Sequence, residues 1–400
     1  MTTFWHAHAT HPDARGALAL AAAQLDAQRA ARSAALPTLG WLYLTDHYAH
    51  QAEALLADAE RRWPGAAWCG AVGVGVAASG VEYFDEPALA LMLTDLPREH
   101  FRVFSGRRPL AWPQAHAALV HADPATPDLA ELVAELARRT RTGYLFGGLA
   151  SARTRTVHLA DGVFEGGLSG VAFDASLALV SRVTQGCQPI GPGRRVTEAE
   201  RNLVLRLDGE PALDCLLRDL GAEAGAPRQA LAALRRTLVG LTDAGADALV
   251  HAGQFGTDTR VRHLVGIDPP RRAIAIGDLA EPGQQLAFCQ RHVEAARRDL
   301  VRICAEIREE LEPAELPLEA PVATSHEAAP GAGAAPIAAA IYVSCAGRGG
   351  PHFGAPSAEL EVVRRALGDV PLVGFFAAGE IARHHLYGYT GVLTAFPAGR

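Results

Sequence analysis

The sequence predicts a mixed α/β protein of two related halves, each with a mixed β-sheet covered by helices. A unit of amphipathic helix, short apolar strand and glycine-bearing turn recurs along the chain, which indicates internal repetition. Other apolar strands follow one another without helices between them, which favours mixed or antiparallel sheets. The 400 residues are about two to three times a usual domain length. We expect the two sheets to pack face to face as an αββα sandwich.

The recurring unit occurs at three places. In each copy the helix has apolar residues at spacings of three and four, and the strand is a continuous apolar run. Gly70 and Gly75 have the same spacing as Gly374 and Gly379, which indicates that the two halves are related. The copies are a helix at 48–62 with a strand at 66–72, a helix at 128–139 with a strand at 144–146, and a helix at 358–367 with a strand at 372–376.

Two segments lie outside this pattern. Residues 1–36 begin with scattered histidines, which we interpret as a flexible polar end, and continue as an Ala-rich helix at 14–35. Residues 312–336 are rich in Pro, Ala, Gly and Glu, a composition that cannot form a core, so we predict a flexible insertion.

Composition excludes several classes of protein. The sequence contains no lysine, so all 37 basic residues are arginine, and P-loop, pyridoxal and protein-kinase chemistry lack their essential lysine. The net charge of −7 and the absence of a basic block argue against nucleic acid or a membrane as partner. The six cysteines form no C-x-x-C pair, and no signal peptide or membrane span is evident. We expect a cytoplasmic protein without a cofactor or a metal.

The segment from Ser344 to Gly350 is the most site-like part of the sequence. An apolar strand at 337–343 leads into Cys345, Gly347, Arg348 and Gly349. Successive glycines can direct backbone N–H groups at an anion, and Arg348 can bind a carboxylate or a phosphate with its guanidinium. The alternative is a tight turn in which Arg348 pairs with a surface acid.

Cys345 has two interpretations. As a nucleophile with His352, His384 or His385 as its base, it would make the protein a hydrolase or transferase acting on an ester, amide or thioester. Most cysteines are inert and buried, so we favour a non-catalytic thiol. A third alternative is a ligand-free scaffold for protein interactions.

Glu380 follows Gly379 at the end of another apolar strand. A carboxylate there can accept an ammonium group, so Arg348 and Glu380 would match the two ends of a zwitterion such as a free amino acid. This requires the two strand ends to lie close together. Gly73–Ala78 fits a loose dinucleotide-binding pattern, but a Gly-rich turn between strands explains it better.

In the first half, Gln185 begins a turn-rich stretch after an apolar strand, and it can both donate and accept hydrogen bonds. Thr197 and Glu200 have the spacing of a capping box, which predicts that a helix begins there. Ser151 and Arg153 follow the glycines of the second repeat, and we take them with Gln185 as candidate ligand contacts.

Taken together, these segments resemble the FIST family of predicted sensory proteins, which have a FIST-N and a FIST-C domain. The resemblance covers the chain from about residue 37 to its end, with every string in the expected order. It implies a FIST-N domain at 37–236, a FIST-C domain at 237–400, and a non-catalytic module that binds a small polar ligand for signalling through a separate protein. The strings that carry it are 146–151, 185–192, 196–202, 208–212, 265–268, 273–278, 344–349 and 379–381.

Overall fold

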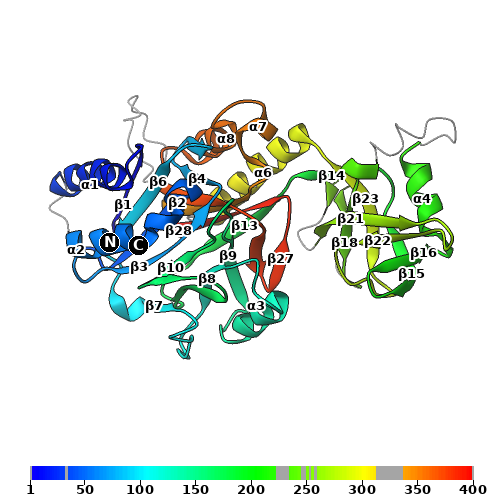
Figure 1. The fold of residues 1–400 in the computed structure, drawn as a ribbon, viewed down its shortest axis with the longest axis horizontal. Coiled ribbons are helices and arrows are strands. Elements are labelled where there is room, and N and C mark those ends of the chain that lie inside the picture. The colour runs from blue at the N-terminus through cyan, green and yellow to red at the C-terminus, as the bar shows by residue number, and fades with distance from the viewer. Residues whose placement is uncertain are drawn as a thin grey trace, which may run out of the picture.

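The computed structural model describes residues 2–31, 35–221, 234–244, 249–251, 254–255, 259–311 and 337–398. Figure 1 shows two lobes of unequal size. The larger lobe, called the body, contains the strands before residue 186 and the elements after residue 292. The smaller lobe, called the inserted lobe, contains the strands from β14 (Cys187–Pro189) to β23 (Gln285–Arg291). The expected insertion at 312–336 lies outside the described residues.

The body is built from three copies of one arrangement of strands. The first copy comprises β1 (Phe4–Thr10), α1 (Ala14–Ala30), β2 (Leu39–Thr45), η1 (Asp46–Gln51), α2 (Ala52–Arg62), β3 (Ala67–Gly73), β4 (Gly75–Ala78), β5 (Val81–Phe84) and β6 (Ala88–Thr94). The second comprises η2 (Arg98–His100), β7 (Phe101–Phe104), β8 (Ala117–Ala122), α3 (Leu129–Arg138), β9 (Tyr144–Leu149), β10 (His158–Ala160), β11 (Val163–Phe164) and β12 (Leu168–Phe173). The third comprises β13 (Val180–Gln185), α6 (Val293–Leu311), β24 (Ile337–Cys345), α7 (Gly349–Phe353), α8 (Ala358–Leu367), β25 (Leu372–Ala377), β26 (Glu380–Arg383), β27 (His385–Tyr387) and β28 (Thr390–Pro397).

The three six-stranded sheets of the body have equivalent strand orders: β1-β6-β2-β3-β10-β11, β7-β12-β8-β9-β26-β27 and β13-β28-β24-β25-β4-β5. The central pair of each sheet is parallel and joined by a helical connection, and its other neighbours are antiparallel. In each copy, the hairpin that follows the second parallel strand joins the sheet of another copy. The first copy gives β4 and β5 to the third, the second gives β10 and β11 to the first, and the third gives β26 and β27 to the second. This exchange links the three copies in a cycle.

The strongest sequence signal of the repeat is a glycine in the second parallel strand of each copy. A Cβ atom on Gly70, Gly147 or Gly374 would lie 1.9, 2.0 or 1.7 Å from a backbone carbonyl oxygen of the adjacent parallel strand. No side chain is accommodated at that distance, so glycine is required at all three positions. The mixed α/β fold class predicted from sequence is confirmed. The sequence analysis expected two related halves, whereas the described structure contains three copies of the repeat.

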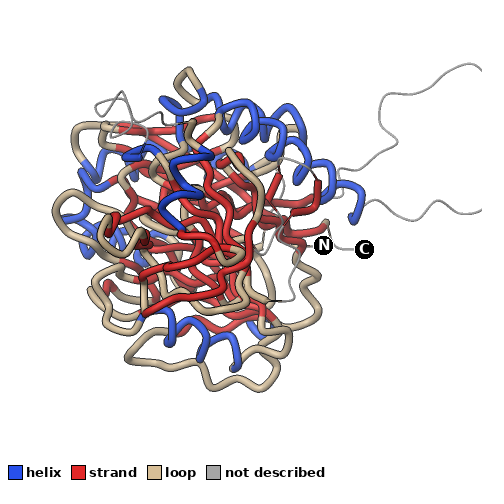
Figure 2. The backbone as a smooth tube through the Cα atoms, turned by 90° about the vertical axis from the view of Figure 1, so that its right-hand side faces the viewer, coloured by secondary structure: helices blue, strands red, loops and turns tan. Residues whose placement is uncertain are grey.

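The three sheets pack on one shared apolar core. Trp41, Phe146, Phe173, Phe375 and Phe396 come from all three copies and are buried in that core. The outer faces of the sheets are covered by α1 and α2, by α3, and by α6 and α8 respectively. Figure 2 shows the same layering, with strands in the interior and helices at the periphery. The arrangement is therefore three helix-covered sheets around one core, rather than a sandwich of two sheets.

The inserted lobe lies between β13 and α6 of the third copy. Strand β23 pairs with both β15 and β18, which closes the main sheet of the lobe into a barrel around its own apolar cluster. Its other elements are β15 (Arg194–Glu200), β16 (Leu203–Leu207), β17 (Glu210–Pro211), α4 (Ala212–Asp219), β18 (Leu238–Thr242), β19 (Leu249–His251), β20 (Gln254–Phe255), β21 (Arg260–Asp268) and β22 (Ala273–Ile276). The barrel takes strands from both sides of residue 236, so the expected boundary at 236/237 falls within this lobe.

Two local predictions are wrong. Residues 4–10 form β1, which pairs with β6, instead of a flexible polar end. Residues 197–200 belong to strand β15 instead of beginning a helix, because pairing with β16 supersedes the local capping pattern. The Ala-rich helix is present as α1, and residues 73–75 form the expected turn between β3 and β4. Of the helices in the described part of the chain, none combines the length and apolar composition needed to cross a membrane.

Candidate functional site

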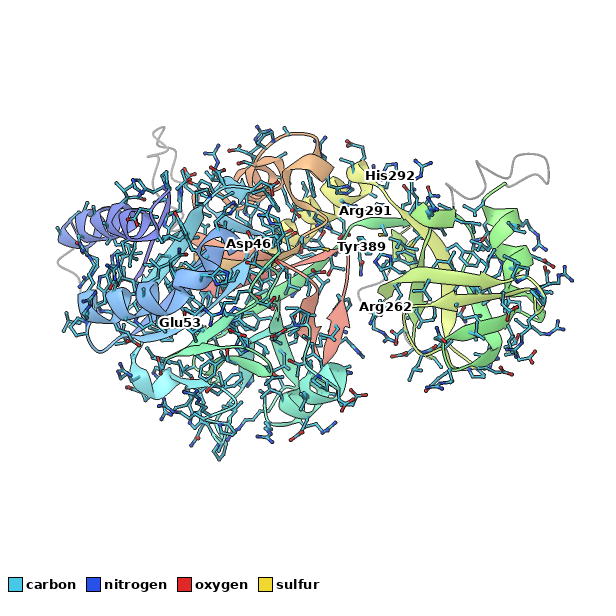
Figure 3. All side chains as sticks on the ribbon, viewed as in Figure 1. Asp46, Glu53, Arg262, Arg291, His292 and Tyr389 are labelled. Atoms are coloured by element: carbon cyan, nitrogen blue, oxygen red, sulfur yellow. The ribbon has the colours of Figure 1, made fainter. Side chains whose placement is uncertain are left out.

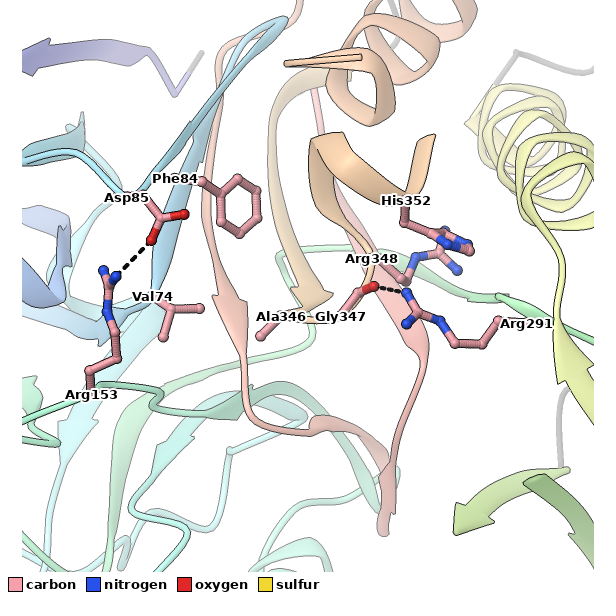
Figure 4. Close-up of a pocket in the computed structure, with 9 residues that line it drawn as sticks. All are labelled: Val74, Phe84, Asp85, Arg153, Arg291, Ala346, Gly347, Arg348 and His352. Carbon is pink, nitrogen blue, oxygen red and sulfur yellow. Dashed lines mark hydrogen bonds and ion pairs between the residues drawn. The ribbon is translucent and has the colours of Figure 1, made fainter. Parts of the chain in front are cut away.

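A pocket of about 510 Å³ opens at the ends of β24 and β25. We call it the Arg348 pocket (Figure 4). Its lining comes from all three copies of the repeat and from the last residue of β23 in the inserted lobe. The lining residues are Val74, Phe84, Asp85, Arg153, Arg291, Ala346, Gly347, Arg348 and His352.

The strand exchange explains why a pocket forms at this place. Strands β24 and β25 are parallel and end side by side, with Cys345 opposite Ala377. From there the chain after β24 continues into α7, whereas β25 leads into β26 in a different sheet. Ligands of open α/β sheets typically bind outside the carboxyl ends of parallel strands at a point where neighbouring connections diverge. The position of the pocket follows this rule.

Arg348 forms the buried floor of the pocket, with only 2% of its surface exposed. Its Nε donates a hydrogen bond of 2.8 Å to Oε1 of Glu359, and its guanidinium lies over the ring of Phe353. Glu359 also accepts hydrogen bonds from the hydroxyls of Tyr342 and Ser344. Arg348 is therefore held in place by a buried carboxylate and not by a surface acid, as the tight-turn alternative would require.

Both terminal nitrogens of Arg348 lack a hydrogen-bond partner among the described residues. Nε2 of His352 and Oε1 of Gln185 are buried and unpaired in the same sense. An unpaired buried polar group costs about 1–3 kcal/mol, and more when it is charged. The unpaired nitrogens of Arg348 and His352, which both line the pocket, are typical of a site completed by a ligand or by ordered water.

Arg291 provides a second cation on the pocket wall. Its guanidinium donates to the carbonyl oxygen of Gly347 and lies 5.6 Å from the ring of Tyr389. Burial and the charges of Arg291 and Arg348 lower the pKa of His352 to about 4, so His352 is neutral at pH 7. Figure 3 places Arg291 and Tyr389 where the two lobes meet.

The opposite end of the pocket is lined by an ion pair that is already complete. Arg153 donates from its backbone N, Nε and Nη2 to the carboxylate of Asp46 at 2.8–2.9 Å. Its Nη1 donates to Asp85 at 2.6 Å. Figure 4 shows Arg153 and Asp85 at one side of the pocket, and Arg348, Arg291 and His352 at the other.

Glu380 is fully buried and does not line the pocket. Its Oε2 accepts hydrogen bonds from the backbone N and the hydroxyl of Thr390, while Oε1 has no partner in the described part of the chain. Burial raises the pKa of Glu380 to about 8, against the lowering effect of Thr390 and of the Arg348 charge. The charge of Arg348 therefore acts on Glu380, while the prediction that the two residues hold the two ends of one ligand stays a prediction.

Cys345 is partly buried, and burial together with the charge of Glu380 raises the pKa of its thiol to about 12. Nucleophilic cysteines have the opposite property, a lowered pKa beside a base or a cation. Within the described residues no hydrogen bond joins Cys345 to a histidine, and His385 interacts with the charges of Arg260 and Asp243 in the inserted lobe. These observations argue against the cysteine-enzyme alternative.

The remaining candidates have structural contacts. The Ser151 hydroxyl accepts from the backbone N of Val74 at 2.9 Å and donates to the carbonyl of Phe376 at 2.5 Å, so it ties all three copies together. Gly379 accepts a backbone hydrogen bond from Leu149. A Cβ atom on Gly349, whose φ is +29°, would lie 2.3 Å from the Phe84 ring.

Gln185 lies at the crossing between the lobes. Its backbone N donates to Asp299, and its side-chain Nε2 donates to the carbonyl of Thr259 in the inserted lobe. It does not line the pocket.

Among the described residues, no group of three or more His, Cys, Asp or Glu side chains is arranged to hold a metal ion.

Sequence reasoning did not identify Phe84, Asp85 and Arg291 as part of the site. Arg291 is the last residue of β23, directly before α6, and its own segment contains no glycine-rich or other site-like pattern. The only local signal for Phe84 and Asp85 is their position after the Gly73–Gly75 turn. Their position in the same pocket as Arg348 depends on the strand exchange, which joins segments separated by more than half of the chain.

Fold and site together define a mixed α/β protein with an arginine-lined pocket at a strand divergence. Residues 38–210 match the FIST N domain and residues 212–383 match the FIST C domain. The chain therefore belongs to the FIST family, whose domains are classed as sensory.

Mycobacterial proteins are similar along much or nearly all of the chain. Uncharacterized protein Rv0628c of Mycobacterium tuberculosis strain H37Rv is 30% identical over 406 aligned residues, covering 97% of each chain. Uncharacterized protein Mb0898c of Mycobacterium bovis is 30% identical over 258 residues, covering 64% of this chain and 59% of the relative. These similarities support the assignment of the chain to its family, and the names of these relatives do not indicate a ligand.

Proposed function

We propose that this protein is a sensor that reversibly binds a small anionic metabolite in the Arg348 pocket and performs no chemistry on it. The observation that carries the proposal is the buried Arg348 guanidinium, whose Nη1 and Nη2 have no partner in the described structure. Two parallel N–H donors of a guanidinium match the two oxygens of a carboxylate or phosphate. Arg291 adds positive charge beside them.

The composition of the pocket supports a sensory role. Its walls come from three repeats and from the inserted lobe, so a bound ligand would contact all four segments at once. Such a ligand can stabilise one arrangement of these segments, provided that it binds one arrangement more tightly than another. In this proposal a separate signalling protein recognises that arrangement.

The proposal is tested by thermal unfolding of the purified protein with amino acids, small carboxylates and inorganic phosphate. A ligand at about one hundred times its Kd adds ~2.7 kcal/mol of stability. We expect one class to stabilise the parent protein but not Arg291→Gln, which removes the more exposed cation. Arg302→Gln serves as a matched control, because Arg302 is partly exposed on α6 and does not line the pocket. Absence of stabilisation by every compound contradicts the proposal.

A further inference from the structure

The two ends of the Arg348 pocket differ in their balance of charge. At one end, Arg153 pairs with two carboxylates, those of Asp46 and Asp85, so this end has one negative charge in excess. At the other end, Glu359 compensates Arg348, while Arg291 has no carboxylate partner among the described residues. Because His352 is neutral, the pocket lining at that end has one positive charge without a carboxylate partner in the described structure, that of Arg291, while the charge of Asp299 also acts on Arg348 from outside the lining. A singly charged anion balances this end better than a doubly charged one.

Apolar side chains occupy the stretch between these two ends. Val74, Phe84 and Ala346 are each partly exposed and pack against the apolar cluster beneath α6 and α8. The Phe84 ring is fixed by the ring of Phe376, with 4.2 Å between centroids, and by its contact with Gly349. In Figure 4 these three residues lie between Arg153 and Arg348. A ligand anchored at Arg348 therefore has an apolar surface directly beside it.

We propose that the ligand is a carboxylic acid monoanion that carries a short aryl or branched alkyl group. Its carboxylate would accept from Nη1 and Nη2 of Arg348, and its apolar group would cover Val74, Phe84 and Ala346. The inference rests on the proposed function and narrows it, since an anion alone would need only the arginines. Phe84 is then a specificity-determining residue.

The head-group end offers a third donor or acceptor. Nε2 of His352 is buried and has no partner in the described structure. The ring of His352 lies beside the guanidiniums of Arg348 and Arg291 (Figure 4). A neutral imidazole N–H can donate to a carboxylate oxygen without adding charge. The planar edge of Arg348 with one imidazole donor suits a planar carboxylate.

The test compares four probes by isothermal titration with the full chain: phenylacetate, acetate, inorganic phosphate and 2-phenylethanol. We expect phenylacetate to bind at least tenfold more tightly than acetate or phosphate, and 2-phenylethanol not to bind. The apolar group and the charge are then both required.

Two variants separate the contribution of the apolar wall to binding from the contribution of the positive charge. Phe84→Leu keeps an apolar side chain against Phe376, so it preserves folding better than alanine, and it should reduce the preference for phenylacetate over acetate at least threefold. Phe164→Leu is the matched control, because Phe164 is partly exposed in β11 and does not line the pocket. Arg291→Gln should weaken phenylacetate and acetate by the same factor.

The outcomes distinguish the two proposals. If acetate or phosphate binds as tightly as phenylacetate, or if Phe84→Leu leaves the preference unchanged, the carboxylic acid inference is overturned while the sensor proposal stands. If no probe and no compound of the wider panel binds the parent protein, both are overturned.

Discussion

The first and third copies of the repeat have equivalent strand ends, but an ion pair occupies the space beyond the strand end in the first copy and a pocket opens there in the third. Thr45 ends β2 opposite Gly73, and Cys345 ends β24 opposite Ala377, so Asp46 and Ala346 occupy equivalent positions. In the first copy, Asp46 is bound by three nitrogens of Arg153, which arrives on the chain exchanged from the second copy. In the third copy, Ala346 has no such side chain, and the Arg348 pocket opens there.

This difference shows that the fold places equivalent strand ends in each copy. A single side chain then determines whether the space beyond a strand end is occupied by an ion pair or stays open as a pocket. In the second copy the carboxylate lies one position earlier, at Asp123, and it accepts from the backbone N of Ala125 and of Gly166. The third copy places its carboxylate, Glu359, one helix further along and buries it beneath Arg348. The acid thereby holds the arginine without covering its two terminal nitrogens.

Removing the acid should have a much larger effect in the third copy than in the first. Glu359→Gln leaves the buried Arg348 without its countercharge, and we expect a loss of about 3–5 kcal/mol. Asp46 is buried too, but Asp46→Asn leaves behind Arg153, half of whose side chain is exposed and which still pairs with Asp85, so we expect a smaller loss of about 1–2 kcal/mol. The free energy of unfolding in urea measures both.

A double variant checks the cause of the larger effect. Glu359→Gln combined with Arg348→Met removes both charges, so it should be more stable than Glu359→Gln alone. A double variant as unstable as the single one would mean that lost packing, rather than an unpaired charge, is responsible.

The buried carboxyl of Glu380 predicts that the stability of the body depends on pH. Its pKa is raised from 4.5 to about 8, so between these values the folded state holds one proton more than the unfolded state. The free energy of unfolding should therefore fall by about 1.4 kcal/mol per pH unit as the pH rises through this window. Glu82, with a pKa raised to about 7, acts in the same direction over a narrower range.

Glu380→Gln should flatten this slope between pH 5 and 8, as measured by urea unfolding at several pH values. The matched control is Glu294→Gln in the first turn of α6, where the side chain is exposed. An unchanged slope in Glu380→Gln would show that Glu380 is ionised in the folded protein across this range.

The sequence predicts the repeated helix–strand–glycine units because their signals are local. Gly70, Gly147 and Gly374 follow apolar runs at matching positions, and each helix has its own apolar face. The strand exchange has no local signal. Strands β4 and β26 have four residues each, and which sheet they join depends on contacts about 300 and 230 residues away in the sequence.

As for the fold, only the part of the site that has a local signal could be predicted. Arg348 lies in a Gly-rich loop directly after its strand, so the sequence of its own segment identifies it as a candidate. Phe84 and Arg291 reach the pocket only through the strand exchange and the inserted lobe. The sequence therefore indicates the anion-binding group but not the apolar wall that we propose selects among anions.

The comparison between copies can be tested by converting the open strand end into a filled one. Ala346→Asp places a carboxylate where the first copy has Asp46, in the pocket that Arg291 also lines. This offsets the positive charge of Arg291, so we expect the affinity for phenylacetate to fall about tenfold, or ~1.4 kcal/mol. Ala346→Asn has nearly the same size without the charge and should weaken binding less. Equal losses in both variants would show that volume rather than charge controls entry, and the pocket would then be selective by shape at this point.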